Sequence, residues 1–441
     1  MKYSVVTFGC RVNQADSLGF EEQLLAAGAT ADAPEHADVV IVNTCSVTAS
    51  ADQGARQTVR RIARINPNAR IVVTGCYATR RPDEFQDVAQ VLRVVPNDDK
   101  PHLVSWLSDN LGLTTSGRYG DGPGSCGEAI EPGVAGRTAF TLRVQTGCAQ
   151  PCAYCIIPAT RGAPRSVALE AVVSEIARVS AAGFKEIALT GVHLGSYGRD
   201  LTPSSSLLEL LLTIGSVRLP PSLKLGRTAV ASVEAGHPDL RFRISSLEPM
   251  DCSRDVVDLV AGCDAFAPHF HLPLQHASDR LLAAMRRPYT LAYYADLVDD
   301  IRFRMPNASI GSDLIIGFPG ETDEDFEQLC GYLERSPLTH VHVFPYSDRP
   351  GTAASAMSGK VHGAVIRDRA SRVREIGQRL TLRFRASQAG TIHRGLTLDD
   401  GSVVVTGNYL KVRIPPGRLR NEWVQVKVAA VTENGLTGEL C

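Results

Sequence analysis

The chain has 441 residues, of which 44% are hydrophobic and 21% charged, and its 46 basic and 47 acidic side chains nearly cancel. This length allows two to three domains, and the composition is ordinary for a soluble globular protein. No apolar run reaches membrane-spanning length and the N-terminus does not resemble a signal peptide, so we expect a cytoplasmic protein whose eleven cysteines stay reduced.

The first part of the chain, residues 1–112, alternates apolar runs with helical patterns. The runs YSVVTF, DVVIVN and RIVVTG predict strands of a parallel α/β sheet, and each is followed by a cysteine: Cys10, Cys45 and Cys76. Because the carboxyl ends of parallel strands meet at one edge, where ligands bind in open sheets, we expect these thiols to converge. Three cysteines at equivalent positions favour a cluster site over three core residues.

The remaining elements predict two further domains. Residues 113–137 are rich in glycine and proline and predict a linker. In residues 138–387, six strand-like runs alternate with helical patterns, which predicts a partial (β/α) barrel with functional loops at the carboxyl ends of its strands. Residues 388–441 contain short alternating strands separated by turns, which predict a small antiparallel β-barrel. The expected class is α/β.

The segment QTGCAQPCAYCIIPATRG, at the start of this central region, holds three cysteines within eight residues: Cys148, Cys152 and Cys155. Structural zinc sites usually have four ligands in paired sets, and no fourth ligand lies nearby. Three thiolates on one loop suit a cubane iron–sulfur cluster that keeps one iron open. A disulfide or structural role is the alternative, but clustered thiols in such a chain usually bind metal or act in catalysis.

The CxxxCxxC spacing, with the aromatic Tyr154 before the last cysteine, resembles the signature of the radical S-adenosylmethionine superfamily. The segments TFGCRVNQADS, VNTCSVT and VTGCYA narrow the resemblance to its methylthiotransferase family. This resemblance implies two 4Fe–4S clusters, S-adenosylmethionine as cofactor, and transfer of a methylthio group to an unactivated carbon. The motif cluster would generate the radical and the cluster of the N-terminal sheet would carry the sulfur. An unactivated C–H bond has no acidic proton, so a cofactor must perform this step.

Within the family, GCRVNQ, LTGVHLGSYG, RISSLEPMD and VFPYSDRPGTAA most resemble the group that modifies N6-threonylcarbamoyladenosine. The implied reaction adds a methylthio group to carbon 2 of that base at tRNA position 37, with a reductant such as flavodoxin or ferredoxin. The alternatives are isopentenyladenosine in tRNA, an aspartate of a ribosomal protein, or a non-catalytic iron–sulfur RNA-binding protein. Residues 217–239 form a longer segment than the family pattern implies.

The resemblance also implies which residues hold S-adenosylmethionine along the ends of the barrel strands. They are Tyr154, Thr190, Gly191, Ser245, Ser246, Gln275, Ile316 and Gly317. Core packing is the alternative role for each side chain, and the glycine in IGFPG is also explained by a tight turn.

Basic residues indicate an RNA surface. A predicted helix carries Arg56, Arg60 and Arg64 on one face, and residues 367–385 contain seven arginines against two acids. A solvated helix face is the alternative for each stripe. The terminal barrel resembles the TRAM RNA-binding module, in which we expect Tyr409 to share one strand face with two basic residues. The residues expected to contact RNA are Arg372, Arg379, Arg383, Tyr409, Lys411 and Arg413.

Overall fold

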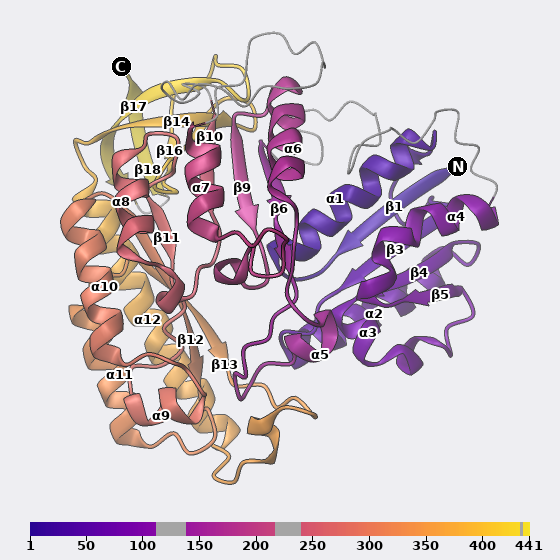
Figure 1. Cartoon of the computed structure of the whole chain (residues 1–441), viewed down its shortest axis with the longest axis horizontal. Helices are drawn as coiled ribbons and strands as arrows, with labels where there is room; N and C mark the ends of the chain where they lie inside the picture. The colour runs from indigo at the N-terminus through magenta and orange to yellow at the C-terminus, as the bar shows by residue number, and fades with distance from the viewer. Residues whose placement is uncertain (112–137, 217–239, 433–434) are drawn as a thin grey trace.

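The computed structural model describes residues 1–111, 138–216, 240–432 and 435–441. The expected linker, 113–137, and the long segment 217–239 lie outside the described residues. Three parts follow one another along the chain (Figure 1): a parallel sheet, a row of parallel strands covered by helices, and a closed barrel. The predicted α/β class is confirmed.

The N-terminal part is a parallel sheet with strand order β2-β1-β3-β4-β5. Its two central strands are almost wholly buried, which explains their continuous apolar runs. The strands are β1 (Lys2–Thr7), β2 (Thr30–Ala31), β3 (Val39–Thr44), β4 (Arg70–Gly75) and β5 (Val91–Val95). The helices are α1 (Arg11–Ala26), α2 (Ala49–Ile65), α3 (Cys76–Arg80) and α4 (Leu103–Leu111).

The central part contains six parallel strands in two neighbouring sheets of three, β10-β9-β6 and β11-β12-β13. Single bridges join β10 and the loop after it to the β11 region, so the row is continuous and forms a partial barrel. The strands are β6 (Ala139–Arg143), β9 (Glu186–Thr190), β10 (Arg241–Ile244), β11 (His269–His271), β12 (Ser309–Ile316) and β13 (His340–Pro345). Two short strands, β7 (Gln145–Thr146) and β8 (Arg165–Ser166), form a separate pair.

Helices cover the outside of this row of strands (Figure 1). Their apolar faces pack with the strands into the largest hydrophobic core of the described chain. The first turn of α11 is stabilised by a capping box, in which Thr322 and Asp325 each accept the other's backbone N–H. The helices are α5 (Ile157–Arg161), α6 (Leu169–Ala181), α7 (Leu207–Ser216), α8 (Arg254–Gly262), α9 (Asp279–Ala284), α10 (Leu291–Arg304), α11 (Asp323–Arg335) and α12 (Gly363–Ser387).

The C-terminal part is a closed barrel with strand order β14-β15-β16-β18-β17. The barrel is antiparallel as predicted in four of its pairings, and in the remaining one β16 and β18 run parallel. The hairpin of β17 and β18 turns the chain round, so β18 closes the barrel in the same direction as β16. The strands are β14 (Ile392–Leu398), β15 (Val403–Thr406), β16 (Lys411–Arg413), β17 (Trp423–Thr432) and β18 (Gly435–Leu440). None of the described helices has the length and apolar character needed to cross a bilayer.

Buried carboxylates join the three parts. Asp16 of α1 pairs with Lys100 at 2.6 Å and with Arg161 at 3.2 Å, and it also pairs with Arg143. Burial alone would raise the pKa of Asp16, but the three cations hold it well below its usual range. Because Arg143 and Arg161 belong to the central part, this ion cluster fixes the N-terminal sheet against it.

A second and a third buried carboxylate act in the same way. Asp52 of α2 pairs with Arg80 at 2.6 Å and with Arg349, from the loop after β13, at 2.5 Å. Glu186 of β9 pairs with Arg241 at 2.6 Å. It also pairs with Arg243 at 3.0 Å, and both arginines reach carbonyl oxygens of the terminal barrel.

Candidate functional site

A cleft of about 1140 Å³ lies where the three parts meet. Its walls are the loop after β1, the carboxyl ends of β9 and β10, residues along β11, β12 and β13, and the loop before β16. The three cysteines of the N-terminal sheet line this cleft, as does Arg161 of α5, the helix that follows the CxxxCxxC loop. The cleft is therefore shared by all three parts of the chain.

Two glycines allow the N-terminal cysteines to converge. Gly75, with φ +99°, precedes Cys76, and a Cβ there would lie 2.2 Å from a backbone oxygen of β3. Gly9, with φ +93°, precedes Cys10, and a Cβ there would lie 2.4 Å from the Sγ of Cys45. A side chain at either position would push the strand ends apart.

The surroundings of these thiols suit a cluster held by thiolates. Burial, together with the nearby Cys10 and Cys76 thiols, raises the pKa of Cys45 to about 11, so a bound metal would be needed to hold Cys45 as a thiolate at neutral pH. Arg161 lies beside Cys76, and although burial opposes its charge, Cys76 and Asp16 raise its pKa above the usual value. A fixed cation beside the thiols favours the thiolate form.

The second set of cysteines lies on the loop after β7. Burial, with Cys152 and Cys148 adding to it, raises the pKa of Cys155 to about 12, which shows that these thiols also interact. The Sγ of Cys152 accepts a hydrogen bond from Arg287 at 3.2 Å, and that guanidinium also pairs with Glu248. Sequence reasoning missed Arg287 and Glu248, because only the fold brings them to the CxxxCxxC loop.

Both cysteine sets fit a multi-iron cluster better than a single ion. Among the described residues, one group of three ligand atoms lies within 4.8 Å of one another, and it consists of His271, Asp313 and His342. Each set offers three thiolates, which are soft ligands. This number and type of ligand suit a 4Fe–4S cluster that keeps one iron open for another ligand.

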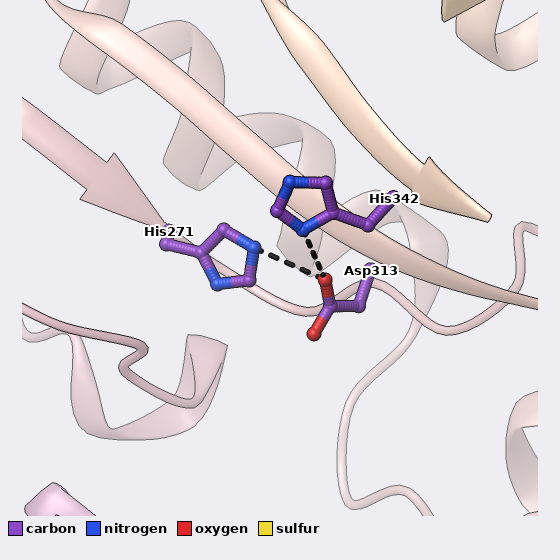
Figure 2. Close-up of side chains that lie close together, drawn as sticks. All are labelled: His271, Asp313 and His342. Carbon is purple, nitrogen blue, oxygen red and sulfur yellow. Dashed lines mark hydrogen bonds and ion pairs between the residues drawn. The ribbon is translucent and has the colours of Figure 1, made fainter. Parts of the chain in front are cut away.

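The histidine group was missed by sequence reasoning. The Nε2 of His271 and the Nδ1 of His342 both lie 3.1 Å from Oδ1 of Asp313 (Figure 2). Burial alone would raise the pKa of Asp313, but hydrogen bonds from the two histidines lower it to about 2. The same contact with Asp313 raises the pKa of His342. These side chains, with His269 and His340, form the polar wall of the cleft on β11, β12 and β13.

Comparisons with known proteins give the family. Residues 2–96 match the uncharacterized protein family UPF0004, and residues 142–333 match the radical SAM superfamily. The chain is 32% identical over 425 residues to the threonylcarbamoyladenosine tRNA methylthiotransferase MtaB of Aquifex aeolicus, covering 94% of this chain and 96% of the relative.

The chain belongs to the radical S-adenosylmethionine methylthiotransferases, in the MtaB group.

Other relatives agree with this placement. The enzyme of the same name from Bacillus subtilis is 33% identical, with coverage of 87% of this chain and 81% of the relative. A tRNA-2-methylthio-N(6)-dimethylallyladenosine synthase from Methylacidiphilum infernorum is 27% identical, with coverage of 98% and 93%. The radical S-adenosylmethionine methyltransferase TsrM from Kitasatospora setae has the same fold, with a TM-score of 0.55 at 15% identity and coverage of 80% and 75%. The cofactors of the family are two 4Fe–4S clusters and S-adenosylmethionine.

The residues expected to hold S-adenosylmethionine fall into two sets in this methylthiotransferase. Within the described chain, the cleft lining includes Thr190, Gly191, Ser245 and Ser246. It does not include Tyr154, Gln275, Ile316 or Gly317. The backbone of Gln275 is hydrogen-bonded to β12, and Gly317, with φ +81°, forms a turn in which a Cβ would meet Ile366 at 2.4 Å. All eight assignments stay predictions.

The expected strand position of Tyr409 was wrong. Tyr409 has φ +65° and precedes β16, so it lies in a turn and does not alternate with Lys411 and Arg413. Its ring lies between the guanidinium of Arg243, 3.8 Å from the ring centre, and the imidazole of His269, at 4.8 Å. Tyr409 lines the cleft from this turn, while Lys411 and Arg413 are exposed on the strand, and Lys411 also lines the cleft.

The arginines of α12 that were expected to bind RNA contact α11. Arg372 pairs with Glu327, and Arg379 pairs with Glu334 at 3.0 Å. Arg383 donates to backbone carbonyls at the end of the same helix. On α2, Arg56 pairs with Glu84 at 2.7 Å, whereas Arg60 and Arg64 are exposed. Most of these charges are thus partly neutralised by acidic neighbours or main-chain oxygens.

Proposed function

We propose that this methylthiotransferase adds a methylthio group to carbon 2 of N6-threonylcarbamoyladenosine at tRNA position 37. The names of the relatives in the MtaB group support this substrate. The observation that carries the proposal is the shared cleft, in which the cysteines of the N-terminal sheet line the same space as the carboxyl ends of β9 and β10 and the side chains of β11, β12 and β13. A base placed there would lie against the cysteines proposed to hold the sulfur source. The cysteines proposed for the radical cluster are outside the described lining, on the loop that leads into α5, whose Ile157 and Arg161 line the cleft.

In this proposal, Cys148, Cys152 and Cys155 hold the radical cluster, and Cys10, Cys45 and Cys76 hold the auxiliary cluster. When bound, the clusters and S-adenosylmethionine supply the radical that removes a hydrogen atom and the sulfur and methyl group that replace it. The chain's own residues bind and orient these groups. Arg161 keeps positive charge beside Cys76, and Arg287 does so beside Cys152.

The remaining parts of the proposal concern partners. Thr190, Gly191, Ser245 and Ser246 line the cleft and would orient S-adenosylmethionine there. Reductive cleavage of the sulfonium consumes an electron, so a reductant such as flavodoxin or ferredoxin is required. The tRNA would place its anticodon loop in the cleft and its backbone along the basic rim of α12 and the terminal barrel.

The test is modification of defined RNA. The reconstituted enzyme is incubated anaerobically with S-adenosylmethionine, a chemical reductant and tRNA that carries threonylcarbamoyladenosine, and the nucleosides are then measured by mass spectrometry. We expect the 2-methylthio derivative of that base and none on tRNA that carries isopentenyladenosine. The reverse preference, or modification of a ribosomal protein alone, would overturn the proposed substrate.

Two variants test whether one cysteine set serves radical formation and the other serves sulfur supply. Replacement of Cys148, Cys152 and Cys155 by alanine should leave iron for one cluster and abolish formation of 5′-deoxyadenosine. Replacement of Cys10, Cys45 and Cys76 should also leave one cluster, yet 5′-deoxyadenosine should still form while methylthiolation stops. Iron analysis and product chromatography measure both outcomes. Equal loss of 5′-deoxyadenosine in both variants would contradict the assignment.

A further inference from the structure

The cleft is lined by more basic than acidic side chains. The described residues that line it include four basic side chains, Arg11, Arg161, Arg385 and Lys411, and a single carboxylate, Asp313. That carboxylate already accepts contacts from two histidines. The cleft therefore has positive charge available for an anionic ligand.

Arg11 is the cation best placed to contact an anionic group on the base. It directly follows Cys10, and its guanidinium donates to the Oγ of Ser245 at 3.3 Å and to the hydroxyl of Tyr409. Both partners are neutral, and no carboxylate among the described residues pairs with Arg11. Other guanidiniums at the junctions between the parts, such as those of Arg161 and Arg349, each face a carboxylate.

The polar wall continues from Arg11 across the floor of the cleft. Tyr409 contacts the imidazole of His269 at 4.8 Å, and His269, His271, His340 and His342 occupy neighbouring positions on β11 and β13. The Oγ of Ser246 lies 3.1 Å from Nδ1 of His271, Ser309 contacts His269 and Thr339 contacts His340, so each of these imidazoles has a polar neighbour. An apolar substituent against this wall would displace water from its polar atoms and form no hydrogen bond in return.

We propose that Arg11 binds the carboxylate of the threonylcarbamoyl group and that the histidine wall receives its hydroxyl and carbamoyl groups. This inference rests on the proposed function and names the residues that select its substrate. Carbon 2 of the base and the carbon that bears N6 belong to the same ring. If carbon 2 faces the cluster beside Cys10, the N6 substituent therefore lies within a few ångströms of Arg11. A dimethylallyl group has no charge, so binding it would cover the guanidinium while leaving it only neutral partners.

The same residues do not suit a divalent cation. A metal at His271, Asp313 and His342 would occupy the single carboxylate among the described lining residues and add positive charge near Arg11, Arg385 and Lys411, none of which faces a carboxylate among the described residues. An anion relieves that repulsion, whereas a cation increases it.

The experiment pairs a change in the protein with a change in the ligand. Binding is measured for anticodon stem-loop RNA that carries threonylcarbamoyladenosine and for the same RNA with the carboxylate converted to its methyl ester. In the wild type, esterification should weaken binding about 10- to 100-fold, because a charge-assisted hydrogen bond is lost. In Arg11→Gln, both RNAs should bind with the weakened affinity and esterification should have no further effect.

Control measurements distinguish a specific role of Arg11 from misfolding, loss of a cluster or a general loss of charge. Arg335→Gln, an exposed arginine at the end of α11, should keep the full effect of esterification. Iron content and thermal unfolding should match the wild type in Arg11→Gln, and Arg11→Lys should recover part of the discrimination. Equal esterification effects in Arg11→Gln and wild type, or a rise in KM for S-adenosylmethionine alone, would overturn the inference. If the wild type does not modify threonylcarbamoyladenosine at all, the proposed function fails first.

Discussion

At the scale of single residues, the histidine wall depends on the absence of a side chain. Gly311 of β12 pairs with His271 on one side and His340 on the other. A Cβ at Gly311 would lie 2.2 Å from Nε2 of His340 and 3.0 Å from a ring carbon of His271. The glycine thus makes room for imidazoles that reach across the strand.

We expect Gly311→Ala to destabilise the protein by about 1–3 kcal/mol, because the methyl group overpacks against a partly buried ring. Truncation of the ring in Gly311→Ala with His340→Ala should recover most of that loss, since the clash is then removed. Denaturant unfolding measures both effects. Gly331→Ala on α11, where the nearest atom belongs to a flexible arginine, is the matched control and should not destabilise. Additive losses in the double variant would contradict this explanation.

The sequence predicted the cysteine cluster of the N-terminal sheet but did not predict the histidine wall. The cysteines of the N-terminal sheet could be placed together because the ends of parallel strands share an edge. The histidine wall could not, since it depends on the register of three strands, in which His271 pairs with Gly311 and Asp313 with His342. Tyr409 was misplaced because its positive φ interrupts the strand pattern.

At the scale of elements, α12 has two different faces. Arg372 and Arg379 pair with glutamates of α11, whereas Arg385, near the end of the helix, lines the cleft with no ion-pair partner among the described residues. Lys411 at the start of β16 also lines the cleft without such a partner. A cation that already faces a carboxylate contributes less to phosphate binding than a free one.

We therefore expect Arg385→Ala and Lys411→Ala to weaken tRNA binding and Arg372→Ala to change it little. Each lost phosphate contact should reduce the slope of log Kd against log salt by about 1, and the paired arginine should leave the slope unchanged. Filter binding over a range of salt concentrations measures the slopes. A flatter slope in Arg372→Ala would show that α12 releases its arginines from α11 to bind RNA.

At the scale of the whole molecule, the buried Glu186 makes the packing of the terminal barrel depend on pH. Burial alone would raise the pKa of Glu186, but Arg243 and Arg241 lower it from 4.5 to about 2. Because the unfolded chain binds the proton more readily, this stabilisation is complete above about pH 5 and is lost as the pH falls toward 2. Its size is about 3 kcal/mol.

We expect the urea midpoint of the wild type to fall more steeply between pH 5 and pH 3 than that of Glu186→Gln, which lacks the titrating group. The variant should also be less stable at pH 7, because two buried arginines lose their carboxylate. Circular dichroism during urea titration at each pH measures the midpoints. Parallel pH profiles for the two proteins would mean that other carboxylates, such as Asp16, dominate the acid response.

The terminal barrel is held to the central strands through its backbone. Arg243 donates to the carbonyl of Gly407 at 2.6 Å, and Arg241 donates to the carbonyls of Arg394, at 3.2 Å, and Val405, at 3.3 Å. A main-chain oxygen is present whatever the side chain is, so mutation of the barrel residues does not by itself remove these contacts. In evolution these main-chain contacts therefore persist when side chains on the barrel surface change. Arg241, Arg243 and Glu186 make their contacts through their side chains. Among related proteins, we therefore expect these three residues to stay the same while the barrel residues whose carbonyls they contact vary.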